Sequence, residues 1–293
     1  MMRPDGGSRE PAPLRSVAET LAAEAAEFVR RRRAEVFGTK AERAARGAVR
    51  SKSTPTDPVT VVDTEAERLL RERLAALRPG DPILGEEGGG PTDPAGTPAG
   101  SVTWVLDPID GTVNFVYGIP AYAVSVAAQI DGVSVAGAVA DVVAGRVYSA
   151  ATGLGAHVTD EQGTDPLRCA AVEDLSMALL GTGFGYSRRR RATQAALLAR
   201  MLPVVRDVRR IGSAALDLCM VAAGRLDAYY EHGLQVWDRA AGALIAAEAG
   251  ARVLLPAHDG PGGGGLVVAA APGIADELLA VLERFNGLDP ILD

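Results

Sequence analysis

Five carboxylates in three short blocks are the residues of this sequence best suited to chemistry. Glu86 and Glu87 end the segment PILGEE, Asp107 and Asp110 follow the apolar run WVL, and Asp238 ends the segment QVWD. Each block closes an apolar run, and a carboxylate at the end of a buried strand is held rigidly while it faces the rim of a sheet. We therefore expect the three blocks to meet at a site that binds a hard cation.

The segment DPIDGT holds two of these carboxylates three positions apart. Pro108 fixes its own φ and disfavours the helical conformation at Asp107, so we expect a sharp turn in which Asp107, Asp110 and an intervening carbonyl converge. Without a cation, two such carboxylates repel each other. Oxygen-only ligands favour Mg²⁺ or Mn²⁺ over Zn²⁺, and Mg²⁺ commonly shares its ligands with substrate phosphate. Phosphate chemistry is therefore the leading hypothesis.

Each block also has a simpler interpretation when it stands alone. A DPxDG segment can be only a tight turn whose aspartates bond to local N–H groups. Glu86 and Glu87 can be a solvated pair, and Asp238 can be the N-cap of the helix that follows it. Predicted helix starts at Thr112 and after Ser213 can cradle a phosphate, although ordinary serine capping also explains the second. The combination of all the blocks favours the metal site.

The composition argues against several other classes of protein. The chain has 293 residues, with 30 Lys and Arg against 37 Asp and Glu, and its net charge of −7 argues against a nucleic-acid-binding protein with a basic surface. No apolar run approaches the roughly 18 to 20 residues that span a bilayer, and the N-terminal segment lacks the apolar stretch of a signal peptide. Two cysteines and three scattered histidines form no zinc-type cluster, and we expect free thiols. We therefore expect a cytoplasmic protein that binds neither nucleic acid nor a membrane.

Hydrophobic periodicity predicts an α/β protein of two halves. Residues 1–15 are expected to form a flexible tail, and Ser16 precedes a helix that ends at Gly38. Residues 16–158 are expected to place helices on one face of an antiparallel sheet, because short apolar runs after Val102 alternate with turn residues. Residues 159–293 alternate helical and strand-like segments, which predicts helices layered with a second, mixed sheet.

Three segments together resemble the inositol monophosphatase family of Mg²⁺-dependent, lithium-sensitive phosphatases. They are Gly85–Glu87 (GEE), Trp104–Phe115 (WVLDPIDGTVNF) and Trp237–Gly242 (WDRAAG), which stand in the order found in the family. The resemblance extends from about Lys52 to Val253. It implies the layered αβαβα sandwich of the sugar phosphatases in one compact unit, and a homodimer.

The resemblance also implies roles for individual residues. The implied metal ligands, for two or three Mg²⁺ ions that Mn²⁺ could replace, are Glu86, Asp107, the carbonyl of Ile109, Asp110 and Asp238, with Asp63 near a weaker third ion. The implied catalytic residues are Glu86, Thr112 and Asp63, in which Thr112 pairs with Asp63 to help deprotonate the attacking water. The implied substrate contacts are Asp110, Gly111, Thr112, Gly212, Ser213, Ala214, Glu231 and Asp238.

The implied function is hydrolysis of myo-inositol 1-phosphate or a related small polyol phosphate by metal-activated water. Paired metal ions suit this in-line displacement, and no covalent phosphoenzyme is needed. Fructose-1,6-bisphosphatase, histidinol-phosphatase and 3′-phosphoadenosine nucleotidase remain alternatives because they share the same core. Glu231 favours inositol, since one carboxylate can accept hydrogen bonds from two vicinal hydroxyls.

A non-enzymatic alternative is a regulatory binding protein of the transcription machinery, as some bacterial relatives are associated with it. In that case the metal site would be dispensable and the surface would carry the function. The run Arg188–Arg191 is either a solvated helix face or a surface that steers phosphate or binds a partner.

Overall fold

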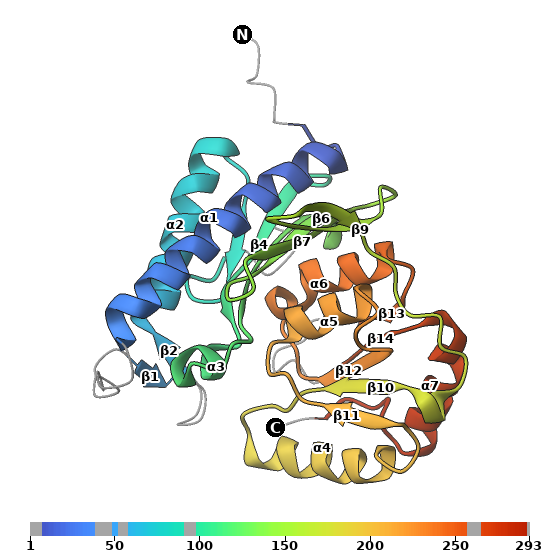
Figure 1. Ribbon diagram of the computed structural model, residues 1–293. Coiled ribbons are helices and arrows are strands. Elements are labelled where there is room, and N and C mark those ends of the chain that lie inside the picture. The colour runs from blue at the N-terminus through green and yellow to red at the C-terminus, as the bar shows by residue number, and fades with distance from the viewer. Residues whose placement is uncertain (1–7, 39–48, 52–57, 91–97, 257–264, 292–293) are drawn as a thin grey trace.

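The computed structural model describes residues 8–38, 49–51, 58–90, 98–256 and 265–291. Its helices are α1 (Pro11–Phe37), α2 (Val61–Leu77), α3 (Thr112–Tyr117), α4 (Arg188–Met201), α5 (Ala214–Ala222), α6 (Val236–Glu248) and α7 (Pro272–Arg284), with a 3₁₀ turn at Leu175–Met177. Helices α1 and α2 cover one sheet, α5 and α6 lie between two sheets, and α4 and α7 cover the far face of the second (Figure 1). The expected αβαβα sandwich is confirmed.

The first sheet is a meander in which neighbouring strands follow one another along the chain. Its order is β3-β4-β5-β6-β7-β8-β9, and all neighbours pair antiparallel except β3 and β4, which are parallel. The strands are β3 (Ile83–Gly85), β4 (Val102–Asp110), β5 (Ala123–Ile130), β6 (Val133–Asp141), β7 (Arg146–Ala151), β8 (Ala156–Asp160) and β9 (Gly163–Pro166). Asp131 and Gly132, which join β5 to β6, have φ of 50° and 79°, as tight hairpin turns require. The antiparallel arrangement expected after Val102 is confirmed.

Helix α1 begins earlier than its periodicity predicts. We expected a tail up to residue 15, but the helix starts at Pro11, because a proline in the first turn has a helical φ already and lacks only an N–H that would have no partner. Leu14 is fully buried, so the residues after Pro11 belong to the packed fold. Residues 1–7 lie outside the described part of the chain. The predicted end at Gly38, which has a φ of 58°, is confirmed.

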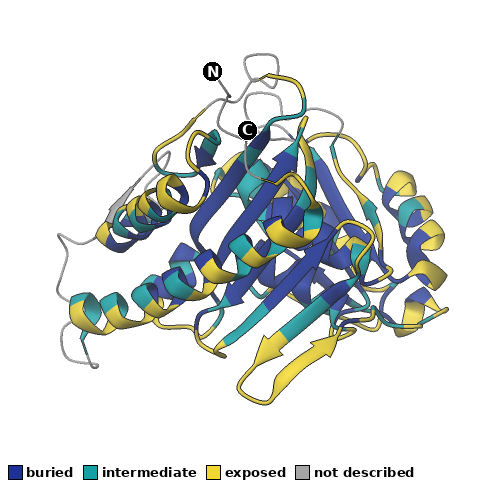
Figure 2. Ribbon diagram, turned by 90° about the horizontal axis from the view of Figure 1, so that it is seen from above, coloured by how far each residue is buried: buried dark blue, intermediate teal, exposed yellow. Residues whose placement is uncertain are grey.

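Both faces of the first sheet are covered by helices. We expected helices on one face, and α1 and α2 do pack there. The second face packs on α5 and α6, which come from the C-terminal half of the chain. This approach is close because the contact residues are small: a Cβ added to Gly137 of β6 would lie 3.0 Å from the Cα of Ala241 on α6. The central strands β4 and β5 are almost entirely buried, whereas β9 and the end of β8, at the edge of the sheet, are exposed (Figure 2).

The second sheet is mixed, as expected. Its order is β11-β10-β12-β14-β13, with β10 parallel to β11 and β12, and β14 antiparallel to β12 and β13. The strands are β10 (Leu179–Thr182), β11 (Asp207–Arg209), β12 (Ala228–His232), β13 (Arg252–Leu254) and β14 (Leu266–Ala270), and a separate ribbon pairs β1 (Val49–Ser51) with β2 (Pro58–Thr60). The boundary expected after residue 158 falls inside β8, because the first sheet continues through β9.

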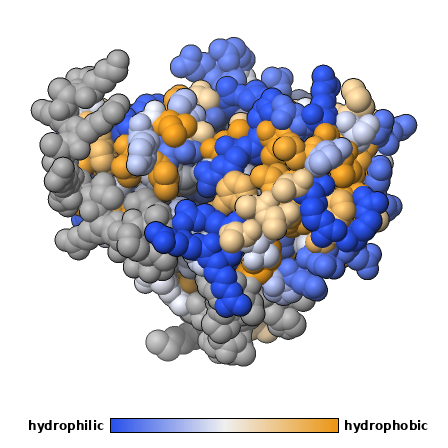
Figure 3. Space-filling model, turned by 90° about the horizontal axis from the view of Figure 1, so that it is seen from below, coloured by the Kyte–Doolittle hydropathy of each residue, from blue (hydrophilic) through white to orange (hydrophobic). Residues whose placement is uncertain are grey.

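The cysteines, the apolar character of the helices and one face of the surface complete the description of the fold. Cys169 and Cys219 are free thiols, as expected. Among the described residues, no helix combines the length and the apolar character that crossing a bilayer needs. On the face shown in Figure 3, apolar side chains of the described residues gather near the middle and hydrophilic side chains surround them.

Candidate active site

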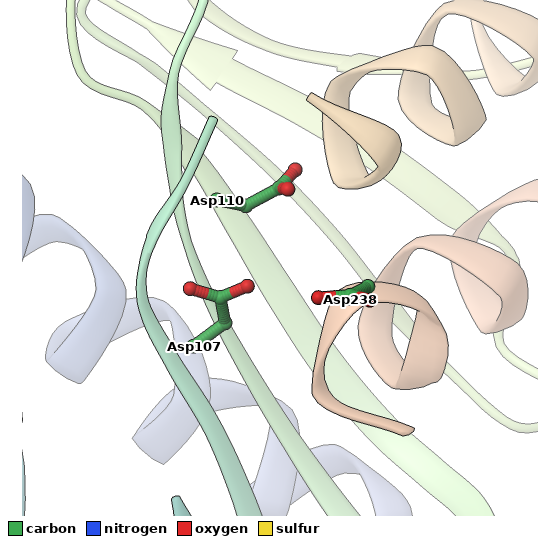
Figure 4. A group of neighbouring side chains, drawn as sticks. All are labelled: Asp107, Asp110 and Asp238. Atoms are coloured by element: carbon green, nitrogen blue, oxygen red, sulfur yellow. The ribbon is translucent and has the colours of Figure 1, made fainter. Parts of the chain in front are cut away.

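Three aspartates from two distant parts of the chain come together where the two halves meet. Asp107 and Asp110 lie on β4, and Asp238 lies in the first turn of α6 (Figure 4). One carboxylate oxygen of each lies within 4.8 Å of one oxygen of each of the others. Asp107 is 1% exposed, so this is not a solvated acidic patch.

The segment between Asp107 and Asp110 differs from the expected sharp turn. Strand β4 continues to Asp110, and its pairing with β5 shifts register between the two aspartates. The N–H of Ile109 donates to Asp107 Oδ1 at 3.0 Å, so part of the simpler interpretation, a local bond of the aspartate, is present as well. An irregularity of this kind lets a strand present two carboxylates on one side, where strict alternation would separate their directions.

The simpler interpretation of Asp238 as an N-cap is wrong, because Gln235 is the N-cap of α6. Helix α6 begins at Val236, and Asp238 is the third residue of its first turn, where its Oδ2 accepts from the N–H of Gln235 at 2.7 Å. The two form a capping box. We expected Asp238 to end a strand, and it lies in a helix instead. The capping bond nevertheless fixes its carboxylate.

Asp110 is tied to the start of α5. Its Oδ2 accepts from the hydroxyl of Ser213 at 2.5 Å and from the N–H of Ala215 at 2.7 Å. The Ser213 hydroxyl also accepts from the N–H of Leu216, as an N-cap does. Serine capping and a link to the acidic cluster are thus both present.

Thr112 and Asp63 meet as the resemblance implied. The Thr112 hydroxyl lies 3.2 Å from Asp63 Oδ1 and 3.0 Å from the carbonyl oxygen of Ile109. Asp63 is fully buried in the first turn of α2, where its Oδ2 accepts from the N–H and the hydroxyl of Thr60. Burial raises the pKa of Asp63 to about 7, and the negative charge of Glu86 adds to the shift while the bonds from Thr60 oppose it.

Glu86 lies beside the three aspartates without belonging to the closest group of oxygens. It follows β3, is half-buried, and its N–H donates to the carbonyl of Leu106 on β4 at 3.1 Å. Its side chain is close enough to Asp107 to raise the pKa of that carboxyl through its charge and a hydrogen bond.

The grouped carboxylates disfavour one another's charged forms. Burial raises the pKa of Asp107 well above its ordinary value, and the charges of Glu86, Asp110 and Asp238 raise it further. Loss of solvation followed by the charges of Asp110 and Glu86 likewise raises the pKa of Asp238. Because the pKa of each of the three aspartates is raised in the absence of a counter-charge, the cluster is suited to hold a cation.

The expected substrate contacts surround this cluster. Gly111 and Gly212 face each other: a Cβ on Gly111, whose φ is 93°, would lie 3.1 Å from the Gly212 carbonyl oxygen. Ala214 is the first residue of α5. Glu231 on β12 accepts a hydrogen bond from the hydroxyl of Tyr229, and a Cβ on Gly183 would collide with its carboxylate.

Comparisons with known proteins agree with this geometry. The family model described as the inositol monophosphatase family matches residues 10–286 of this chain. The chain belongs to the inositol monophosphatase family. A Mycobacterium leprae protein named inositol-1-monophosphatase is 81% identical over 285 residues, which cover 97% of this chain and 98% of that protein. The solved structure of Mycobacterium tuberculosis SuhB superposes with a TM-score of 0.81 at 69% identity, over 96% of this chain and 100% of that one. A Pasteurella multocida protein named Nus factor SuhB is 39% identical over 229 residues, 76% of this chain and 81% of that protein.

Sequence reasoning missed two residues that support this inositol monophosphatase-type site. Asn114 donates through Nδ2 to the carbonyls of Ala121 and Ile211, at 2.8 and 2.9 Å, and so ties α3 to the loop before α5. No sequence signal predicts a contact 97 positions away. Thr60, in contrast, stands three residues before Asp63, and this spacing is the signature of a capping box.

One of the four arginines of the run Arg188–Arg191 does not fit the solvated-face interpretation. Arg190 is 6% exposed and packs against Gly185, where an added Cβ would lie 2.6 Å from its Cδ. Its positive charge opposes the rise in the pKa of Glu231 that burial causes. Arg188 and Arg189 are exposed, so the run divides between the surface and the interior.

Replacing Ser213 with alanine is expected to lower stability. The variant loses the cap of α5 and the hydroxyl bond to Asp110, which keeps the N–H of Ala215 as a donor, and such losses cost about 1 to 2 kcal/mol. Thermal unfolding of the chelator-treated protein measures the effect as a drop of a few degrees. Ser213→Thr keeps the hydroxyl and is the control. A melting temperature of Ser213→Ala equal to the wild-type value would contradict the view that Ser213 both caps α5 and binds Asp110.

Proposed function

We propose that this protein hydrolyses a small phosphate monoester with the help of two or three Mg²⁺ ions, for which Mn²⁺ can substitute. The observation that carries the proposal is the convergence of Asp107, Asp110 and Asp238 from β4 and α6. The name inositol-1-monophosphatase of the Mycobacterium leprae relative supports myo-inositol 1-phosphate as the substrate.

The donor set fits hard divalent cations. Every side chain of the cluster offers oxygen, and the pKa of Asp107 is raised by burial and by neighbouring negative charges that a cation would compensate. The proposed ligands are Glu86, Asp107, the carbonyl of Ile109, Asp110 and Asp238, with Glu86 and Asp63 near a weaker third ion. When bound, such ions lower the pKa of a water molecule and neutralise charge on the leaving oxygen.

Thr112 and Asp63 are proposed to take the proton of the attacking water. The Thr112 oxygen can accept a hydrogen bond from that water while its own proton points to Asp63 Oδ1, 3.2 Å away. A carboxyl whose pKa is about 7 is suited to accept a proton near neutral pH. The pair thus forms a short path for the proton away from the reacting centre.

Neighbouring groups beside the aspartates are proposed to bind the phosphate and the leaving alcohol. The N–H groups of Gly111 and Thr112, at the start of α3, would bind phosphate oxygens. Gly212, Ser213, Ala214 and Glu231 would contact the hydroxyls of the leaving alcohol. Of these, Glu231 can accept from two vicinal hydroxyls and so favours inositol over a nucleotide.

Phosphate release from a panel of esters tests the substrate. The panel contains inositol, fructose, histidinol and nucleotide phosphates, each assayed with Mg²⁺. We expect kcat/KM for myo-inositol 1-phosphate to exceed the others by roughly tenfold or more, about 1.4 kcal/mol of discrimination. A higher value for another ester would replace inositol in the proposal and leave the metal chemistry intact.

Metal removal is expected to make stability depend on pH. Asp63 has a pKa of about 7 in the folded chain against an ordinary value of 3.8, so the folded state binds more protons than the unfolded state between these values. The chelated protein should therefore lose stability as pH rises from about 4 to about 7, and roughly 5 °C of melting temperature is a reasonable scale for this loss. Saturating Mg²⁺ should restore most of it at about pH 8, because a ligand of the folded state stabilises that state. A flat profile that Mg²⁺ does not change would count against the cluster.

The intact acidic set favours an enzyme over a purely binding protein, although the Pasteurella multocida relative is named a Nus factor. Two further expectations stay predictions, the homodimer and the cytoplasmic location. Exposed apolar side chains such as Tyr117, 74% exposed, suit a homodimer, which light scattering would test. Fractionation of cells would test the cytoplasmic location.

A further inference from the structure

Glu67 is a buried carboxylate beside the site that none of the proposed roles uses. It lies on α2, is 2% exposed, and contacts the turn that carries Glu86. Its Oε2 accepts from the N–H of Glu87 at 2.7 Å, and its Oε1 accepts from the N–H of Gly88 at 2.8 Å. A buried charge that binds two successive backbone donors holds the backbone of that turn in place.

Arg71, one turn further along α2, completes the contact. Its Nε donates to Glu67 Oε1 at 2.8 Å, and its Nη2 donates to the carbonyl of Gly89 at 2.6 Å. The guanidinium thus neutralises the carboxylate and binds the same turn. Together the two side chains hold Glu87, Gly88 and Gly89, and we call Glu67 and Arg71 the α2 clamp.

The turn is shaped to receive the α2 clamp. A Cβ added to Gly85 would lie 2.4 Å from Glu67 Oε1, and one added to Gly88 would lie 2.6 Å from the same atom. Gly85 and Gly89 also exchange backbone hydrogen bonds of 3.1 and 3.0 Å. Glycine is therefore needed at these positions to let the carboxylate approach the backbone.

The α2 clamp restricts Glu86 from one side while the first sheet restricts it from the other. The N–H of Glu86 donates to the carbonyl of Leu106, the residue before Asp107 on β4. The next N–H along the chain, that of Glu87, donates to Glu67. The backbone of Glu86 is therefore fixed relative to both Asp107 and α2.

We propose that Glu67, together with Arg71, is a positioning residue for Glu86 and thereby sets the affinity of the metal ion that Glu86 binds. The inference rests on the proposed metal site. Groups that orient metal ligands without touching the ion typically change metal affinity by about 10- to 100-fold when they are replaced. A residue that only stabilised the fold would change the melting temperature and leave the metal affinity of the folded protein unaltered.

The test measures Mn²⁺ binding by titration calorimetry in Glu67→Gln. The amide keeps the size of the side chain but turns an NH₂ group toward N–H and guanidinium donors. We expect at least one Mn²⁺ binding step to weaken by about tenfold or more. The Mg²⁺ concentration for half-maximal phosphate release should rise by a similar factor, and excess Mg²⁺ should restore kcat.

Glu72→Gln is the matched control. Glu72 lies on the same helix and pairs with Arg68 at 3.5 Å with the same i,i+4 spacing, but it is 63% exposed. Its replacement should leave the Mn²⁺ isotherm and the Mg²⁺ dependence unchanged.

Gly88→Ala approaches the α2 clamp from the turn and keeps every charge. Gly88 is exposed and its φ is not in the left-handed region, so alanine can adopt its conformation, yet the added Cβ displaces the Glu67 carboxylate. This variant should weaken the same Mn²⁺ binding step, and it decides the question if Glu67→Gln does not fold.

The outcomes separate this inference from the proposed function. If folded Glu67→Gln and Gly88→Ala both bind Mn²⁺ as the wild-type protein does, the positioning role is overturned, whatever the activity of the variants. A wild-type protein that binds Mn²⁺ but releases no phosphate from any ester would end the proposed function, and the isotherms of the variants would still decide the role of Glu67. The positioning role would also be overturned if Glu67→Gln bound Mn²⁺ normally but had a lowered kcat that excess Mg²⁺ did not restore.

Discussion

Asp107→Asn is expected to lower kcat for phosphate release by about 10³-fold or more, the largest single effect that the site predicts. Asp107 is the most buried of the three converging aspartates. Burial and the charges of Glu86 and Asp238 raise its pKa. An amide keeps the shape but offers one neutral oxygen, so it binds a divalent cation poorly. Steady-state assays over a range of Mg²⁺ concentrations measure the loss.

The same variant should not destabilise the protein when metal is absent. The amide removes a buried charge that Glu86, Asp110 and Asp238 repel, so the melting temperature in chelator should stay equal or rise. Asp131→Asn, in the β5–β6 turn, is the activity control because asparagine tolerates the positive φ found there. Unchanged turnover in Asp107→Asn would refute the metal mechanism; lost turnover with unchanged cellular function would favour the binding role.

Thr112→Ala is expected to lower kcat by about 10²- to 10³-fold while KM changes by less than about threefold. Its hydroxyl lies between Asp63 and the carbonyl of Ile109, where it can act on the attacking water and not on the bound ester. Thr112→Ser keeps the hydroxyl and should retain most of the activity. An effect confined to KM would contradict this role.

A second variant tests whether Thr112 and Asp63 act as one unit. Asp63→Asn keeps an acceptor for the N–H of Thr60 but cannot take a proton. Groups that work together are strongly non-additive, so the double variant should lose little more than either single one. Losses that multiply would indicate two separate roles.

The sequence predicts the chemistry of the site better than its supporting structure. The segments around Asp107 and Asp238 predict a cation site through their combination, since each alone also fits a tight turn or a helix cap. Periodicity also predicts the antiparallel meander, since alternation and turn residues are local signals. The exact start of α6 was missed because Val236 and Trp237 read equally well as the end of a strand.

Features that depend on contacts distant in the chain could not be predicted. That α5 and α6 cover the second face of the first sheet follows from small residues such as Gly137 and Ala241 meeting across the two halves. The bond from Asn114 to the carbonyl of Ile211 and the contact of Glu67 with the Glu86 turn have the same origin. Local propensity carries no information about such partners.

Crystals soaked in Mn²⁺ test the central claim most directly. Anomalous difference density should appear among Asp107, Asp110 and Asp238, with metal–oxygen distances of about 2.0 to 2.3 Å, and a further ion should contact Glu86. Density that lies elsewhere, or none at Mn²⁺ concentrations that support turnover, would contradict the assignment of these carboxylates as the metal site.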